Sequence, residues 1–288
     1  FNMLYLVSTR RAMSGWTATM QGKLVGGHGS QRNCTSYYSC IGQKEAQEKE
    51  QEKSMNDLPI TVESTATSLL LSQLIMKAVA PYLTDEHKSP ILTFGQDDRD
   101  TPAVRAFLEA WDAQDSPLPR VYRNYIQSTV FPSLFPASKS VLVQATPNVR
   151  IQLVGSAGIG RRPDTDPSPD IIGLHNDGEF GHPSAEINVV LAVSPVTGSS
   201  GFYYEPDEED VDYDSWPSIE LWPGEIFAHH LNSVRHFNRV NTEKNCRVSL
   251  DFRLIDAAKL DPDDTRKSAT SKSKFIEGEY YVRWASLN

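Results

Sequence analysis

Residues 171–193, IIGLHNDGEFGHPSAEINVVLAV, decide the fold prediction because two apolar runs enclose a polar loop. The first strand-like run is Ile171–Asp177 and the second is Glu186–Val193. His175 and Asp177 stand two positions apart in the first run, and side chains two apart in a strand point to the same face. One imidazole and one carboxylate can therefore reach a single metal ion. An H-x-D step is common by chance, so this prediction needs support from the rest of the chain.

Further strand-like runs surround this stretch. They are separated by Pro, Gly, Asn and Asp, and comprise Ser140–Thr146, Val149–Gly155, Gly201–Glu205, Glu220–His229, His236–Val240 and Arg247–Ile255. Short strands divided by turn residues are typical of closed antiparallel barrels and jelly rolls. The sequence therefore predicts a mainly β protein with supporting helices, built on a double-stranded β-helix (a jelly-roll, cupin-like fold).

Helical patterns precede the strands. Thr65–Tyr82 carries apolar residues close to the helical period, and a second helix is expected from Thr101, whose neighbour Pro102 suits the first helical position. A third is expected over Leu118–Ser128. We expect these helices to pack on the sheet as scaffolding.

Four parts of the chain are predicted. Residues 1–58 form an N-terminal arm with a charged linker, and 59–138 give helical support. Residues 139–256 form the jelly-roll catalytic core, and 257–288 form a C-terminal tail that packs on it.

Charge and hydropathy exclude some classes of partner. The net charge of −9 argues against nucleic acid. No run of about 18 or more apolar residues occurs, so no membrane span is expected. The cysteines show no zinc-type or disulfide-type pairing, which favours a reducing compartment, cytoplasmic or organellar. The acid-free segment before Glu45 allows a transit-peptide remnant, although an ordinary first strand and loop is favoured.

His236 is the predicted third metal ligand. Two histidines and one carboxylate on one side of an iron leave adjacent positions open for a bidentate co-substrate and O₂. His229 and His230 compete for this role. They stand 18 and 17 positions before Arg247, whereas His236 stands 11 before it, which better suits a short hairpin.

The run Arg247-Val-Ser249-Leu-Asp-Phe-Arg253 alternates polar and apolar residues. Alternation places Arg247, Ser249, Asp251 and Arg253 on one face. Buried charges are costly unless paired, and a guanidinium with a neighbouring hydroxyl suits a buried carboxylate such as the far end of 2-oxoglutarate. The alternative is an outward polar face with the apolar residues directed inward.

Four motifs occur in order along the chain: His175-Asn-Asp177-Gly-Glu-Phe-Gly-His182-Pro183, Glu186-Ile-Asn188, His236-Phe-Asn238-Arg-Val-Asn241 and Arg247-Val-Ser249-Leu-Asp-Phe-Arg253. Together they resemble the iron(II)- and 2-oxoglutarate-dependent oxygenases related to the streptomycin-cluster protein StrG and to the algal kainoid synthases. The resemblance implies iron(II) at His175, Asp177 and His236, and 2-oxoglutarate held by Arg247 with help from Ser249. It also implies that Gln152 and Asn188 contact the co-substrate or substrate.

Candidate substrate-binding residues are Arg253, His182, Arg150 and Arg161. Cations near an inferred site in an acidic protein favour a small, polar, carboxylate-bearing substrate. With the resemblance, this points to oxidative ring closure of a prenylated glutamate. A cationic aminocyclitol is the alternative, and it would meet acids such as Glu179, Glu186 or Asp251.

Two rival functions remain. One is a metal- or sugar-binding jelly roll without redox chemistry, and the other is a zinc hydrolase in a cupin-like barrel. Neither explains an Arg-x-Ser step on the strand after the third ligand.

Overall fold

The computed structural model describes residues 59–84, 101–162, 164–207, 212–269 and 272–285. The chain divides into two compact units, Phe1–Glu45 and Ala46–Asn288, and all described residues belong to the second. The predicted arm and charged linker at 1–58 lie outside the described residues.

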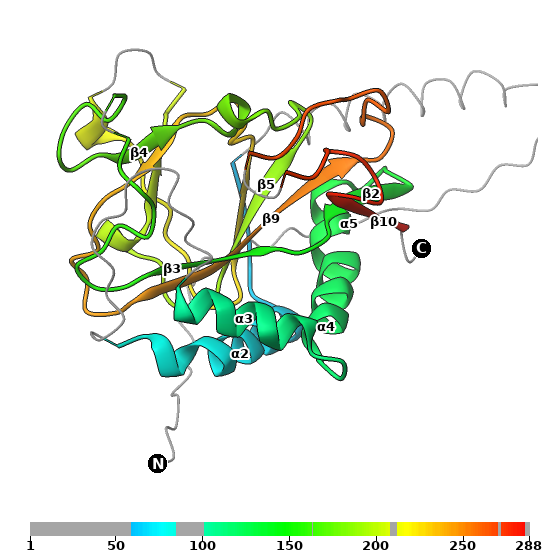
Figure 1. Ribbon diagram of the computed structural model, residues 1–288, viewed down its shortest axis with the longest axis horizontal. Coiled ribbons are helices and arrows are strands. Elements are labelled where there is room, and N and C mark those ends of the chain that lie inside the picture. Colours follow the sequence, from blue (N-terminus) through cyan, green and yellow to red (C-terminus); the bar gives the residue numbers. More distant parts are fainter. Residues whose placement is uncertain (1–58, 85–100, 163, 208–211, 270–271, 286–288) are drawn as a thin grey trace, which may run out of the picture. The chain divides into compact units, whose positions relative to one another are not determined.

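Two antiparallel sheets form the centre of this unit (Figure 1). The strands of the larger sheet are β1 (Ile60–Val62), β2 (Ser140–Gln144), β3 (Asn148–Gln152), β5 (Ile187–Ala192), β7 (Ile226–His229), β9 (Arg247–Asp256) and β10 (Tyr281–Ala285). Their order is β1-β7-β5-β9-β2-β10, with β3 also paired to β9. The smaller sheet contains β4 (Ile172–His175), β6 (Phe202–Tyr204) and β8 (His236–Asn238) in the order β4-β8-β6.

The chain crosses between the two sheets at almost every step. From β3 to β9, odd-numbered strands join the larger sheet and even-numbered strands join the smaller one. Between β6 and β7, Ser218 bridges to Tyr203 and extends the smaller sheet. This winding is that of a double-stranded β-helix, so the predicted fold class is confirmed.

Helices cover one face of the larger sheet (Figure 1). They are α2 (Ala66–Val79), α3 (Pro102–Asp112), α4 (Leu118–Tyr125) and α5 (Phe131–Leu134), with a 3-10 turn at Ala80–Tyr82 and a π-helix at Ile126–Val130. The predicted N-cap Thr101 is confirmed, because its side chain accepts a hydrogen bond from the Val104 amide. Thr65 also caps its helix, since its side chain accepts from the Ser68 amide. The third helix continues farther than expected, through the π-helix into α5. Within the described segments, none of the helices has the length and apolarity that a membrane crossing requires.

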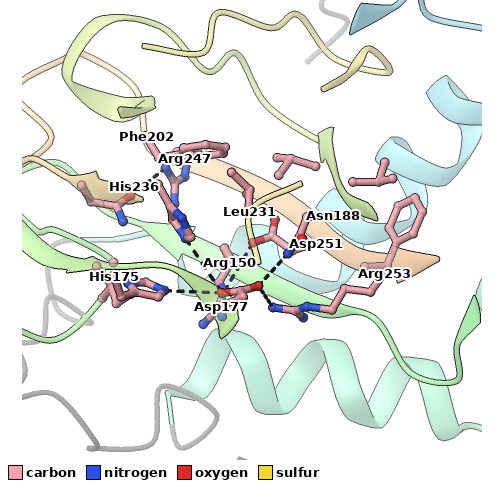
Figure 2. A pocket seen from close by; sticks show the side chains of 16 residues that line it. Arg150, His175, Asp177, Asn188, Phe202, Leu231, His236, Arg247, Asp251 and Arg253 are labelled. Atoms are coloured by element: carbon pink, nitrogen blue, oxygen red, sulfur yellow. Dashed lines mark hydrogen bonds and ion pairs between the residues drawn. The ribbon is translucent and has the colours of Figure 1, made fainter. Parts of the chain in front are cut away.

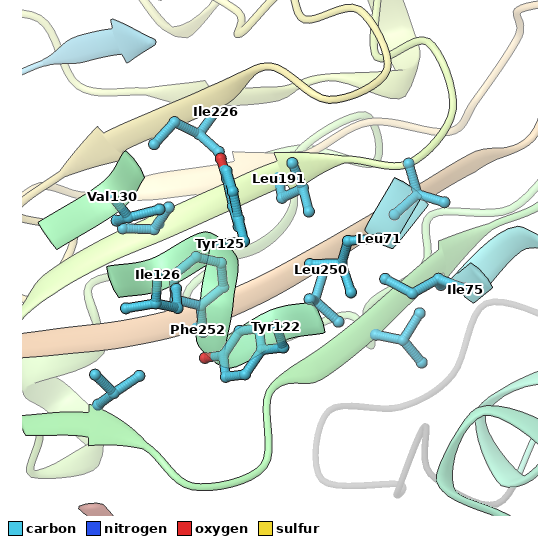
Figure 3. Close-up of a cluster of buried hydrophobic side chains, with 14 of the residues drawn as sticks. Leu71, Ile75, Tyr122, Tyr125, Ile126, Val130, Leu191, Ile226, Leu250 and Phe252 are labelled. Atoms are coloured by element: carbon cyan, nitrogen blue, oxygen red, sulfur yellow. The ribbon is translucent and has the colours of Figure 1, made fainter. Parts of the chain in front are cut away.

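The main hydrophobic core lies between these helices and the larger sheet (Figure 3). Leu71 of α2 and Tyr122 of α4 belong to it together with Leu250 and Phe252 of β9. The period of two then directs the alternate residues of β9 to the opposite face, toward the smaller sheet. The alternative prediction, with the apolar residues of this strand inside the barrel, is therefore wrong.

Two short strands were not predicted. β1 pairs with β7, and β10 pairs with β2 through registers such as Tyr281 with Gln144. Both strands add to the edges of the larger sheet, and β10 brings the C-terminal segment against the core strands.

Candidate metal centre and ligand pocket

Three ligand-type side chains converge between the sheets. His175 ends β4 and His236 begins β8, and the two residues face each other in the β4–β8 register. Asp177 Oδ1 lies 3.5 Å from His175 Nε2 and 3.9 Å from His236 Nε2. All three residues are buried, and their ligand atoms lie within 4.8 Å of one another. This cluster could hold a metal ion.

Asp177 reaches the cluster from a turn rather than from a strand. β4 ends at His175, and a 3-10 turn spans Asp177–Phe180. Asn176 caps the turn, because its side chain accepts from the Glu179 amide while Glu179 accepts from the Asn176 amide. The expected strand through Asp177 is therefore wrong at its end: the Asn-Asp-Gly-Glu order forms a capping box that ends the strand.

The two imidazoles are oriented by backbone carbonyls. His175 Nδ1 bonds to the Gly173 carbonyl, and His236 Nδ1 lies 3.2 Å from the Val234 carbonyl. A carbonyl only accepts, so each Nδ1 carries a hydrogen, and each ring directs Nε2 toward Asp177. Burial, followed by the proximity of His175, lowers the pKa of His236 to about 3. A neutral imidazole with a free Nε2 is the form that binds a metal.

The second oxygen of Asp177 is already occupied (Figure 2). Oδ2 accepts hydrogen bonds of 2.6 Å from Asn188 Nδ2 and from Arg253 Nη2. Burial alone would raise the pKa of Asp177, but the charge of Arg253 lowers it well below its usual range. Asp177 is thus an anion with Oδ1 directed to the imidazoles.

A pocket opens beside this cluster. Besides the three ligand-type residues, it is lined by Arg150 of β3 and by Arg247, Asp251 and Arg253 of β9. Apolar side chains such as Phe202 and Leu231 complete the wall. The polar face of β9 therefore lies inside the barrel.

Arg247 is a buried cation that faces the pocket. It is 6% exposed, and its Nη1 donates to the Ser200 carbonyl at 2.9 Å and to Asn238 Oδ1 at 3.1 Å. Its Nε has no hydrogen-bond acceptor, and no carboxylate of the described residues forms an ion pair with it. Burial lowers the pKa of Arg247 to about 10, so the side chain remains charged at neutral pH.

The other predicted residues of β9 and its neighbours are paired within the protein. Arg253 and Asn188 line the pocket but hold Asp177. Arg150 Nε lies 3.4 Å from Asp251 Oδ2 at the pocket wall. Ser249 Oγ donates to Asp251 Oδ1 at 3.0 Å and is not part of the pocket lining.

Three further predicted site residues do not line the pocket. Gln152 ties two loops together, because its Nε2 donates to the carbonyls of Arg239 at 2.7 Å and Ser156 at 3.1 Å. His182 Nδ1 bonds to Glu186 at 2.8 Å. Arg161 donates to the carbonyl of Pro169 in its own loop. Each of these side chains is engaged by a partner away from the cavity.

The competing histidines lie apart from the cluster. The ring of His229 packs edge-on against Tyr204 and Phe227. His230 Nδ1 donates to the Glu186 carbonyl at 3.1 Å. Among the residues that the structure describes, His236 is the histidine that joins His175 and Asp177.

Two contacts around the site were missed from the sequence. Asn238, which holds Arg247, stands two positions after His236 on β8, so the period of two could have placed it on the same face. Tyr281 donates to buried Glu186 across 95 positions. No local pattern signals that contact.

One curated protein is similar to the chain in sequence. It is the streptomycin biosynthesis protein StrG of Streptomyces griseus, 25% identical over 184 residues, which cover 64% of this chain and 77% of StrG. The resemblance to StrG that the motifs indicate is therefore confirmed. No family model matches the chain.

Several solved structures are also similar. The epimerase SnoN, in complex with Fe³⁺, α-ketoglutarate and nogalamycin RO, has a TM-score of 0.42 and 14% identity over 83% of this chain and 99% of SnoN. The carbocyclase SnoK from nogalamycin biosynthesis has a TM-score of 0.41 and 14% identity over 82% and 95%. EvdO2 of Micromonospora carbonacea var. aurantiaca, complexed with 2-oxoglutarate, has a TM-score of 0.42 and 12% identity over 73% and 90%. These TM-scores lie below 0.5, so the fold follows from the strand order above rather than from these likenesses.

Proposed function

We propose that this protein is an iron(II)- and 2-oxoglutarate-dependent oxygenase. His175, Asp177 and His236 would hold the iron, and Arg247 would bind the far carboxylate of 2-oxoglutarate. The observation that carries the proposal is Arg247, a buried guanidinium without a carboxylate partner among the described residues, on the wall of the pocket that holds the His-Asp-His cluster. A buried charge is costly without an opposite charge, so the pocket favours an anionic ligand at this end.

The donor set fits the metal. Two imidazoles that direct Nε2 toward one carboxylate oxygen match the two-histidine, one-carboxylate site of non-heme iron oxygenases. The second carboxylate oxygen of Asp177, Oδ2, is kept from the metal because it accepts hydrogen bonds from Asn188 and Arg253. Iron bound here, together with 2-oxoglutarate, would supply the activation of O₂ for oxidation of the substrate.

The chain's own residues have three tasks in this proposal. Arg247 orients the dicarboxylate, and Ser200 and Asn238 fix the guanidinium for that purpose. Asn188 and Arg253 orient Asp177. The apolar lining excludes water from the space between metal and substrate.

For the substrate, we propose a small polar molecule that bears a carboxylate, such as a prenylated glutamate closed into a ring. Three arginines line the pocket (Arg150, Arg247 and Arg253) against two aspartates (Asp177 and Asp251). Arg150, on the β3 side of the pocket, is the candidate for the substrate carboxylate, and Asp251 beside it can meet an ammonium group. A cationic aminocyclitol would use Asp251 instead.

A comparison of metals tests this function against a zinc hydrolase, which the same donor set permits. We expect the protein with iron(II), 2-oxoglutarate and air to release succinate, and the zinc(II)-loaded protein to release none. Absence of succinate with iron(II), together with ester or amide hydrolysis by the zinc form, would favour the hydrolase.

A further inference from the structure

A line of buried polar contacts leads from the metal cluster to the C-terminal strand. Arg253 Nη2 lies 2.6 Å from Asp177 Oδ2, and Arg253 Nε lies 3.8 Å from Glu186 Oε2. Glu186 Oε1 in turn accepts a hydrogen bond from the hydroxyl of Tyr281 on β10. Glu186 and Tyr281 are both 0% exposed. Arg253 is thus placed between two buried carboxylates.

Glu186 is held firmly and does not reach the ligand pocket. Besides the hydroxyl of Tyr281, it accepts from His182 Nδ1 at 2.8 Å, and the ring of His182 packs against Phe275 and Tyr280. Glu186 is not part of the pocket lining. Burying a carboxylate costs free energy unless an opposite charge compensates it, so a buried carboxylate outside the pocket calls for a cationic partner.

Arg253 is the cation that the negative charge of Glu186 compensates. Its guanidinium is hydrogen-bonded to a metal-ligand candidate, so on its own it would repel a cation bound at Asp177. The contact of 3.8 Å with Glu186 is too long for a hydrogen bond and acts through charge. Glu186 therefore offsets the positive charge of Arg253 and fixes the direction in which Arg253 meets Asp177.

We propose that Glu186 is a positioning residue of the metal centre. Acting through Arg253, it keeps Asp177 as a ligand with a single free oxygen and offsets the repulsion between Arg253 and the metal. Tyr281 holds Glu186 in place, so the C-terminal strand supports the metal centre from a distance. This inference rests on the proposed metal-binding role of His175, Asp177 and His236.

Glu186→Gln tests the proposal, because glutamine keeps the shape and can still bond to Tyr281 and His182 but removes the charge. We expect its affinity for Mn²⁺, measured by calorimetry in place of iron(II), to fall about tenfold, the lower end of the usual loss when a partner of a metal ligand is changed. Asp264→Asn is the matched control. Asp264 is also a buried acid paired with an arginine, Arg266, and no hydrogen bond or ion pair within the described residues joins it to Asp177. Its variant should bind Mn²⁺ as the wild type does.

Visible absorption of bound Co²⁺ distinguishes a role of Glu186 in positioning Asp177 from a general destabilisation of the fold. With Co²⁺ as the probe, the visible bands of the Glu186→Gln protein should change, because a freed Asp177 can offer both oxygens, while those of Asp264→Asn should not. Unchanged Mn²⁺ affinity and unchanged bands in a folded Glu186→Gln protein would overturn the inference. An equal loss of affinity in Asp264→Asn would overturn it as well.

Two further results keep the test decisive. If Glu186→Gln does not fold, Tyr281→Phe replaces it, since that change keeps the charge of Glu186 but removes its hydroxyl donor. Weaker Mn²⁺ binding by Tyr281→Phe supports the inference, and unchanged binding contradicts it. A wild-type protein that binds no Mn²⁺, Co²⁺ or iron(II) would refute the proposed function itself, whereas wild-type binding with insensitive variants refutes only the role of Glu186.

Discussion

His175 and His236 are register partners in neighbouring antiparallel strands, and their ring centroids lie 4.3 Å apart. Both rings turn Nε2 toward Asp177 Oδ1, because backbone carbonyls hold both Nδ1 atoms. The proposed iron site is therefore one rung of the β4–β8 ladder completed by a turn. Its geometry depends on the pairing of two short strands of the smaller sheet.

His236→Ala should remove metal binding, because it deletes one of two imidazoles in the cluster. His229→Ala should bind Mn²⁺ like the wild type, since the ring of His229 packs against Tyr204 and Phe227 rather than facing the cluster. Calorimetric titration with Mn²⁺ measures both. Binding retained by His236→Ala but lost in His229→Ala would show that the third ligand is wrongly assigned.

Arg247→Leu should weaken 2-oxoglutarate binding while leaving Mn²⁺ affinity unchanged. An unpaired buried carboxylate costs on the order of 3–5 kcal/mol, so the affinity should fall by about two decades or more. The control is Arg150→Leu, which removes another cation of the same pocket, one that lies beside Asp251. If Arg150→Leu loses affinity for 2-oxoglutarate and Arg247→Leu retains it, the residue that binds the far carboxylate lies on β3 instead of β9.

The residues proposed to bind metal and co-substrate could be predicted from the sequence more readily than the contacts that hold them in place. The H-x-D step, His236 and the alternation in β9 are local patterns that bring His175, His236 and Arg247 to the pocket, whereas Asp177 reaches it from a turn rather than from the predicted strand. The capping box at Asn176 also has a sequence signal, which the apolar run before it obscured. The pairing of Glu186 with Tyr281, by contrast, joins positions 95 apart, and no periodicity reports such a distance.

The predicted substrate residues show the same dependence on contacts that no local pattern signals. The sequence does not show which group a basic residue in a loop near the barrel mouth will bond to. Arg161 donates to a carbonyl of its own loop, and Arg253, predicted for substrate, holds Asp177. Charge alone therefore overestimates the number of arginines that are open to a ligand.

The metal-free protein should lose stability as the pH falls from about 6.5 toward 4. Burial, with a smaller contribution from His230, lowers the pKa of His229 to about 4 from its ordinary value of 6.5. The unfolded chain then binds a proton in this window that the folded chain does not, so the free energy of unfolding decreases with falling pH. A shift of this size corresponds to roughly 3 kcal/mol once the pH lies below both values.

His229→Leu should flatten that part of the pH profile. Urea unfolding of the metal-free wild type and variant at several pH values between 7 and 4 measures the difference. Parallel profiles for the two proteins would mean that His229 titrates normally in the folded state.

The class of substrate can be tested by coupling to 2-oxoglutarate turnover. Succinate release should rise with N-prenylated glutamates, whose carboxylates can meet Arg150, and should not rise with aminocyclitols. Arg150→Leu should raise KM for the acidic substrate. Turnover stimulated only by the cationic set would contradict the carboxylate-bearing substrate while leaving the oxygenase proposal intact.

The most direct test of the central claim is anaerobic titration of the protein with iron(II) and 2-oxoglutarate, followed by visible absorption. We expect the weak charge-transfer band of an iron(II)–2-oxoglutarate chelate to develop only when protein, metal and co-substrate are all present. Asp177→Ala should not develop the band, because it lacks the anionic ligand. A wild-type protein that shows no band at saturating iron(II) and 2-oxoglutarate, or an Asp177→Ala protein that shows it in full, would contradict the account.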